Sequence, residues 1–113
     1  MKNREVEHTL SEKMDINQLI TRKEMIEKVK QGKKTAIRRN NRYGDVGDTF
    51  ELEGREYEIT NIYEQKLGDV TEENAKQEGY ESLAAYQESI TSIHKGAVWV
   101  PKLIVWVHEF KTI

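Results

Sequence analysis

The sequence contains no cysteine, which excludes disulfide bonds and thiolate metal sites. A zinc site is not expected either, because the three histidines, His8, His94 and His108, are far apart and lack a paired ligand spacing. The longest apolar run, Leu103 to Val107, has five residues, far fewer than the roughly 20 that a membrane-spanning helix needs. The N-terminus is charged and has no apolar signal core. We therefore expect a cytoplasmic protein without metal, cofactor or membrane partner.

Charge is abundant but nearly balanced. Asp, Glu, Lys and Arg make up 34% of the 113 residues, and the formal net charge is −2, which argues against capture of nucleic acid by bulk electrostatics. The two signs are separated along the chain, because residues 28–42 contain no acid whereas the charged residues within 64–88 are mostly acidic. The basic stretch carries Lys28, Lys30, Lys33, Lys34, Arg38, Arg39 and Arg42. This separation favours a small anionic or polar ligand over a wide duplex-binding face.

The length of the chain fits one domain, since a second core would leave both too small to be stable. We expect this domain to span residues 14–113. Residues 1–13 are polar and weakly periodic, so they are expected to form a frayed end or one short edge strand.

Three segments carry helical signals. A capping box formed by Thr21 and Glu24 predicts the first helix, which ends at Gly32. Thr71 is the expected N-cap of a second helix over residues 72–77. A third helix, with Ser82 as its N-cap, is predicted from four apolar residues at helical spacing, Leu83, Tyr86, Ile90 and Ile93.

The remaining periodic segments indicate strands. Alternation over 49–53, a turn at Gly54 and a return over 55–63 predict a hairpin, with a bulge where the parity of the second arm breaks. Residues 33–39 are expected to form another strand. Residues 102–110 are apolar on both parities, as is typical of a central strand covered on both faces. This order predicts the α+β class, as a small mixed β-barrel of about five to six strands with two to three flanking helices.

Four segments, in this order, resemble the signature of one family. They are GKKTAIRR at 32–39, YGDVGDTF at 43–50, TEENAKQEGY at 71–80 and HEF at 108–110. Over about residues 20–113 the chain is similar to the ASCH (activating signal cointegrator homology) family. The resemblance implies a PUA-like barrel with a cleft between the GKKTAIRR strand and the helix that carries Glu78.

The resemblance implies a protein that binds RNA or a nucleotide in that cleft, and the separation of basic and acidic stretches agrees with this interpretation. Because neighbouring residues on a strand point to opposite faces, only one of the two consecutive arginines is expected to line the cleft. The predicted ligand contacts are Lys34, Thr35, Arg38, Arg39, Tyr43 and Glu78.

Catalysis is the alternative. Small bacterial proteins similar to this chain include an amidohydrolase acting on acetylated cytidine and others with nuclease activity. The resemblance assigns Lys34 as the base and Glu78 as the residue that orients the substrate of an amidohydrolase. Ile37 stands where those enzymes carry a threonine, so the hydroxyl expected to attack the amide is missing, and Thr35 is the only nearby substitute.

Plainer interpretations exist for the same residues. A surface ion pair between Lys34 and Glu78 would contribute at most about 1 kcal/mol and would need no ligand. Trp106 lies within an apolar strand and is expected in the core. For Trp99, beside Pro101, the sequence leaves core packing and base stacking equally open.

Overall fold

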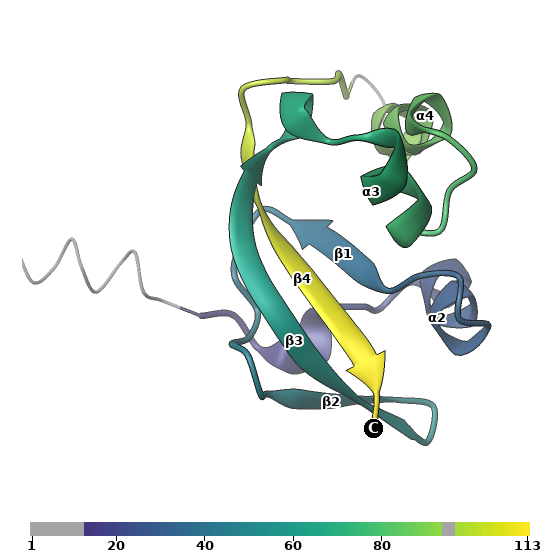
Figure 1. Ribbon diagram of the computed structural model, residues 1–113, viewed down its shortest axis with the longest axis vertical. Coiled ribbons are helices and arrows are strands. Elements are labelled where there is room, and N and C mark those ends of the chain that lie inside the picture. The colour runs from purple at the N-terminus through teal and green to yellow at the C-terminus, as the bar shows by residue number, and fades with distance from the viewer. Residues whose placement is uncertain (1–12, 94–96) are drawn as a thin grey trace, which may run out of the picture.

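A four-stranded antiparallel sheet that curls around the core forms the centre of the fold (Figure 1). The structure is a computed structural model that describes residues 13–93 and 97–113. Its strands follow the order β1-β4-β3-β2 across the sheet. They are β1 (Ala36–Arg39), β2 (Thr49–Leu52), β3 (Arg55–Lys66) and β4 (Ile104–Thr112).

The predicted α+β class is confirmed, but the sheet is smaller and simpler than expected. The described residues form four strands, not five to six, and all their pairings are antiparallel instead of mixed. Residues 98–101 join no strand. A short edge strand was one expectation for residues 1–13. Of these, residues 1–12 lie outside the described part of the chain.

In the part of the chain that the structure describes, three α-helices flank the sheet. They are α2 (Lys23–Lys30), α3 (Glu72–Gln77) and α4 (Leu83–Ile93), with short 3₁₀ turns η1 (Ile16–Gln18) and η2 (Leu67–Asp69). Figure 1 shows α3 and α4 together beyond one end of the sheet, and α2 beside the start of β1. In the described part of the chain, no helix is long and apolar enough to cross a membrane.

The predicted helix starts are confirmed for α3 and α4 but not for α2. The hydroxyl of Thr71 accepts a hydrogen bond from the N–H of Asn74 at 3.1 Å, and Ser82 caps α4 in the same way. The first helix begins one residue later than predicted, with Arg22 as an N-cap that makes no side-chain capping bond. Arg22 instead forms a 2.6 Å ion pair with Glu24, the residue expected to complete the capping box.

The hairpin and the central strand agree with the sequence pattern. Leu52 pairs with Arg55 across a two-residue turn, and the predicted irregularity in β3 is a register shift between Ile59 and Asn61. Strand β4 lies between β1 and β3, so both of its edges are paired. The predicted central position is thereby confirmed, but the expected coverage of both faces is not, because Ile104 is exposed and Trp106 is only half-buried.

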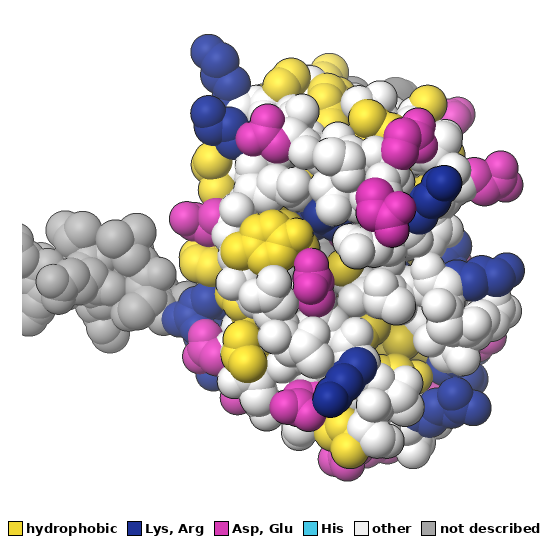
Figure 2. Space-filling model, in the orientation of Figure 1, with side chains coloured by type: hydrophobic (Ala, Val, Ile, Leu, Met, Phe, Trp, Pro, Cys, Tyr) yellow, Lys and Arg dark blue, Asp and Glu magenta, His cyan; other side chains and the backbone are white. Residues whose placement is uncertain are grey.

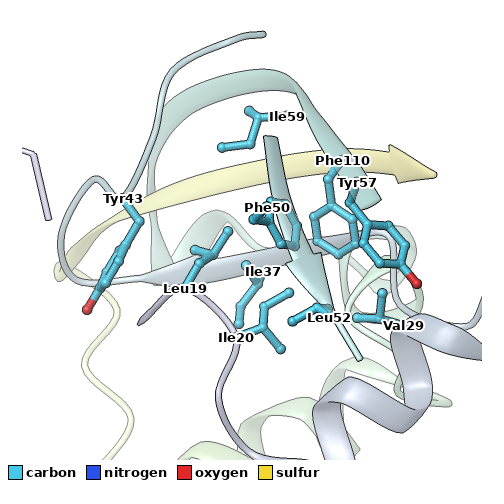
Figure 3. Close-up of a cluster of buried hydrophobic side chains, with 10 residues drawn as sticks. All are labelled: Leu19, Ile20, Val29, Ile37, Tyr43, Phe50, Leu52, Tyr57, Ile59 and Phe110. Carbon is cyan, nitrogen blue, oxygen red and sulfur yellow. The ribbon is translucent and has the colours of Figure 1, made fainter. Parts of the chain in front are cut away.

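Two clusters of buried side chains make up the core. The larger one, drawn in Figure 3, packs the aromatic rings of Phe50, Tyr57 and Phe110 against one another beneath the sheet. The smaller one joins the sheet to α3 and α4 and consists of Leu67, Val70, Ala75, Tyr86 and Val105. Trp99 packs against this second cluster, whereas Trp106, predicted in the core, is only half-buried.

Candidate ligand cleft at the edge of strand β1

Glu78 is positioned by a short helix whose two ends are both fixed by hydrogen bonds. Thr71 and Asn74 form a reciprocal capping box at the start of α3. Directly after Glu78, Gly79 adopts a φ of 94°, and its N–H donates to the carbonyl of Lys76 at 2.9 Å. This left-handed cap ends the helix at Glu78.

Lys34 and Glu78 meet in the interior of the protein. The ammonium of Lys34 donates to Glu78 Oε1 at 2.8 Å and to the Glu78 main-chain carbonyl at 3.1 Å. Lys34 is 1% exposed and Glu78 is 3% exposed. The pair is therefore a buried ion pair, and the interpretation as a surface salt bridge does not describe it.

Arg38 is the second cation on the same carboxylate. Its Nη1 donates to Glu78 Oε2 at 2.9 Å, and its Nε donates to Gln65 Oε1 at 2.8 Å. Gln65 in turn donates to the side chain of Asn74 at 3.2 Å, which links this cluster to the cap of α3. Arg38 Nη2 is buried and has no hydrogen-bond partner among the described residues. A buried guanidinium nitrogen without a partner is costly, so it is a natural contact for a ligand acceptor.

Arg39 has a different set of partners. Its Nη1 donates to the carbonyl of Leu19 at 2.6 Å, and its Nη2 donates to the hydroxyl of Tyr43 at 2.7 Å. The guanidinium also lies over the Tyr43 ring, with Cζ 4.4 Å from the ring centroid. No described carboxylate forms an ion pair with Arg39, so its charge is not neutralised by a direct partner.

His108 holds the chain that follows β1. The N–H of Tyr43 donates to His108 Nε2 at 3.0 Å, which makes Nε2 the unprotonated nitrogen. His108 Nδ1 can then donate to the carbonyl of Ile37, 3.3 Å away. Burial lowers the pKa of this imidazole, in agreement with the neutral form that both bonds require. His108 therefore has a structural role, while His8 and His94 lie outside the described residues.

A cleft of about 450 Å³ runs along the outer edge of β1. Four consecutive residues, Ile37 to Asn40, line it. Because consecutive strand residues point to opposite faces, four in a row can line one cleft only where it follows the strand edge. Both Arg38 and Arg39 consequently line the cleft, and the expectation that only one of them would do so was wrong.

Three of the predicted contact residues are placed elsewhere. Thr35 is exposed, is not among the cleft-lining residues, and its N–H donates to the carbonyl of Gln77 at 2.8 Å. Tyr43 is 6% exposed and belongs to the larger core cluster. Lys34 lies behind Glu78 and does not line the cleft either. The structure thus brings together Arg38, Arg39 and Glu78 at the cleft, with Lys34 supporting Glu78 from inside.

The sequence interpretation missed the aromatic wall of the cleft and the glutamine that orients Arg38. Tyr80 and Tyr86 both line the cleft, with ring centroids 5.5 Å apart. Burial raises the pKa of the Tyr86 hydroxyl, which stays protonated. The core position that helical spacing predicts for Tyr86 is confirmed, since the residue belongs to the smaller core cluster as well as lining the cleft. Gln65 carries no local signal, because its contact with Arg38 depends on how β3, β4 and β1 pair.

The ionised side chains at the cleft carry a net positive charge, although the formal net charge of the whole chain is −2. Lys34 and Arg38 both bond to the carboxylate of Glu78, and Arg39 adds a third cation that forms no ion pair with a described carboxylate. On the face drawn in Figure 2, positive and negative side chains are instead interspersed. Among the described residues, no group of His, Cys, Asp and Glu side chains could hold a metal ion. The arrangement is suited to an anionic or acceptor-rich organic ligand.

Comparison with known proteins gives structural matches only. No protein-family model and no curated protein matches the sequence. The fold is similar to the crystal structure of an ASCH domain from Lactobacillus crispatus JV V101, with a TM-score of 0.64 and 20% identity over 96% of this chain and 84% of the other. The fold is that of an ASCH domain. A DUF984 protein, EF3133 from Enterococcus faecalis V583, is similar to the same degree, with a TM-score of 0.64 and 14% identity over 99% of this chain and 84% of the other. The resemblance to ASCH proteins predicted from four segments is thus confirmed at the level of the fold.

Proposed function

We propose that this protein binds a nucleotide, either free or as part of RNA, in the cleft along β1. The observation that carries the proposal concerns Arg38, a residue that lines the cleft and whose buried guanidinium has one nitrogen, Nη2, without a described partner. A ligand oxygen or ring nitrogen at this point would satisfy that donor. The ASCH fold, which suggests RNA binding at most, agrees with this function without specifying the ligand.

The other properties of the cleft fit such a ligand. Its volume of about 450 Å³ lies within the range of small-molecule sites. The half-buried Tyr80 offers aromatic surface at the cleft on which a base can stack, and the buried Tyr86 supports it from behind. Arg39 carries a charge without a carboxylate partner and can attract a phosphate.

Three observations favour binding over the amidohydrolase alternative. Lys34, the base of that mechanism, does not line the cleft and is held against Glu78. Both carboxylate oxygens of Glu78 already accept hydrogen bonds from cations. Ile37 supplies no hydroxyl for attack on an amide and belongs to the larger core cluster.

The proposal is tested by calorimetric titration with AMP, CMP, GMP and UMP and with a short single-stranded RNA. Arg38→Lys keeps a cation beside Glu78 but removes Nη2, so we expect it to weaken binding at least about tenfold. Arg55→Lys is the matched control, because Arg55 is exposed and is not among the cleft-lining residues. Thermal unfolding of each variant checks that it is folded.

Two results would contradict the proposal: no binding of any probe, or equal binding by the Arg38→Lys and Arg55→Lys variants. Affinity for RNA should also weaken as salt rises, since phosphate contacts release counterions. In a separate assay, the protein is incubated with N4-acetylcytidine. Deacetylation that disappears in a Glu78→Gln variant shown to be folded by thermal unfolding would favour the amidohydrolase instead.

A further inference from the structure

The main chain of Arg38 faces away from β4, the one strand that pairs with β1 among the described residues. The N–H of Phe110 donates to the carbonyl of Thr35 at 3.1 Å, and Ala36 pairs with Glu109. In an antiparallel ladder, hydrogen-bonded and non-hydrogen-bonded pairs alternate. The pair formed by Arg38 and Val107 is therefore of the non-hydrogen-bonded type. It follows that the Arg38 N–H and C=O both point outward from the open edge of β1.

Two further observations place these groups in the cleft. Arg38 as a whole is 8% exposed, but its side chain is only 1% exposed, so the remaining exposure belongs to its main chain. Neither the N–H nor the C=O of Arg38 has a hydrogen-bond partner among the turns, loops and caps that the structure describes. Because the cleft follows the edge of β1, both groups border it.

We propose that the Arg38 main chain reads the ligand, its N–H donating to an acceptor and its C=O accepting from a donor on one edge of a planar base. This inference rests on the proposed function and deepens it, because it specifies the chemistry of the ligand. The ligand must carry a donor beside an acceptor in one plane, as the Watson–Crick edge of a nucleobase does. The ligand forms the pair of main-chain hydrogen bonds with β1 that one residue of a strand added to the sheet edge would form.

The proposal separates two roles of Arg38. Its side chain, held by Glu78 and Gln65 and only 1% exposed, places a positive charge directly behind the main chain that borders the cleft. Its main chain supplies the paired donor and acceptor that distinguish a base from a plain anion. Inorganic phosphate therefore satisfies only part of the site and should bind more weakly than a nucleotide.

The experiment is amide hydrogen exchange followed by NMR on the full chain, with and without the nucleoside monophosphate that binds best. In the free protein, the Arg38 amide should exchange faster than those of Ile37 and Arg39, which are bonded to β4. The nucleotide should slow exchange at Arg38 at least about tenfold. The Glu51 amide, on β2 away from the cleft, is the control and should not change.

A second measurement uses the ligand. The same nucleotide methylated on its Watson–Crick ring nitrogen should bind at least about tenfold more weakly, because the methyl group blocks the edge that β1 reads. If the nucleotide binds but exchange at Arg38 is unchanged, or if the methylated analogue binds equally well, main-chain recognition is wrong and the proposed function stands. If no nucleotide binds, the proposed function fails and this inference fails with it.

Discussion

Lys34 Nζ and Glu78 Oε1 lie 2.8 Å apart although 44 positions separate the two residues in the chain. The contact joins the turn after α2 to the end of α3, and Arg38 completes it from β1. One carboxylate thus holds two buried cations from two separate segments. The geometry of the cleft depends on this one residue more than on any other.

Removing the charge of Glu78 should destabilise the fold strongly. Glu78→Gln leaves Lys34 and Arg38 buried without a counter-charge, so we expect a loss of about 3 kcal/mol or more in the free energy of unfolding. Urea denaturation measures this loss. Glu81→Gln is the control, since Glu81 is exposed and should change stability by less than about 0.5 kcal/mol. A similar effect of the two variants would mean that the buried pair contributes nothing.

Gly79→Ala should cost stability through the backbone. The φ of 94° at this position is unfavourable for alanine by about 1–2 kcal/mol, and the new Cβ would lie 3.0 Å from Lys28 Cδ. Gly32→Ala, at a φ of 78° with no atom within 4 Å of the new Cβ, carries the backbone cost alone. Urea denaturation should therefore rank Gly79→Ala as the more destabilising change. The reverse order would show that the contact with Lys28 is relieved at no cost.

Stability should fall on mild acidification because of His108. Its pKa in the folded protein is lowered from 6.5, mainly by burial, so below pH 6.5 the unfolded chain takes up a proton that the folded chain refuses. The stabilisation is complete above pH 6.5, decreases as the pH falls toward the folded pKa, and levels off below it.

The measurement is the free energy of unfolding between about pH 8 and pH 5, compared with His108→Gln. Any histidine shared by both proteins cancels in the difference, so the variant should lose part of the slope. Parallel curves would show that the His108 imidazole titrates alike in the folded and unfolded chains.

Two tyrosines buried in the same cluster should respond differently to loss of the hydroxyl. Tyr57 Oη is buried and has no hydrogen-bond partner among the described residues, so Tyr57→Phe should leave stability unchanged or raise it by up to about 1 kcal/mol. Tyr43 Oη accepts a 2.7 Å hydrogen bond from Arg39, so Tyr43→Phe should cost about 1–2 kcal/mol. Thermal unfolding of both variants under identical conditions tests the pair. Equal losses would indicate that Tyr57 has a partner after all.

Local signals predicted the elements of this fold well. The capping residues Thr71 and Ser82, the turn at Gly54 and the two-sided apolar pattern of β4 each act within a few positions, so sequence alone reveals them. The start of α2 was misplaced by one residue. There, the side chain of Glu24, which was expected to complete the capping box with Thr21, forms an ion pair with Arg22 instead.

The site was harder to predict because it depends on pairing between distant strands. The partnership of Arg38 with Gln65 requires β4 to lie between β1 and β3, which no local pattern specifies. The prediction that only one arginine would line the cleft assumed that the cleft covers a face of the sheet. It follows the edge instead, where side chains of both parities are adjacent.

The position of β1 at the margin of the sheet also affects how copies of this protein encounter one another. An unpaired strand edge is a template for pairing with a foreign strand. Here the strand has four residues, two of them arginines, so a second copy would bring like charges together. The short length and the two arginines of β1 thereby discourage two copies from pairing edge to edge, while the edge stays open to a small ligand.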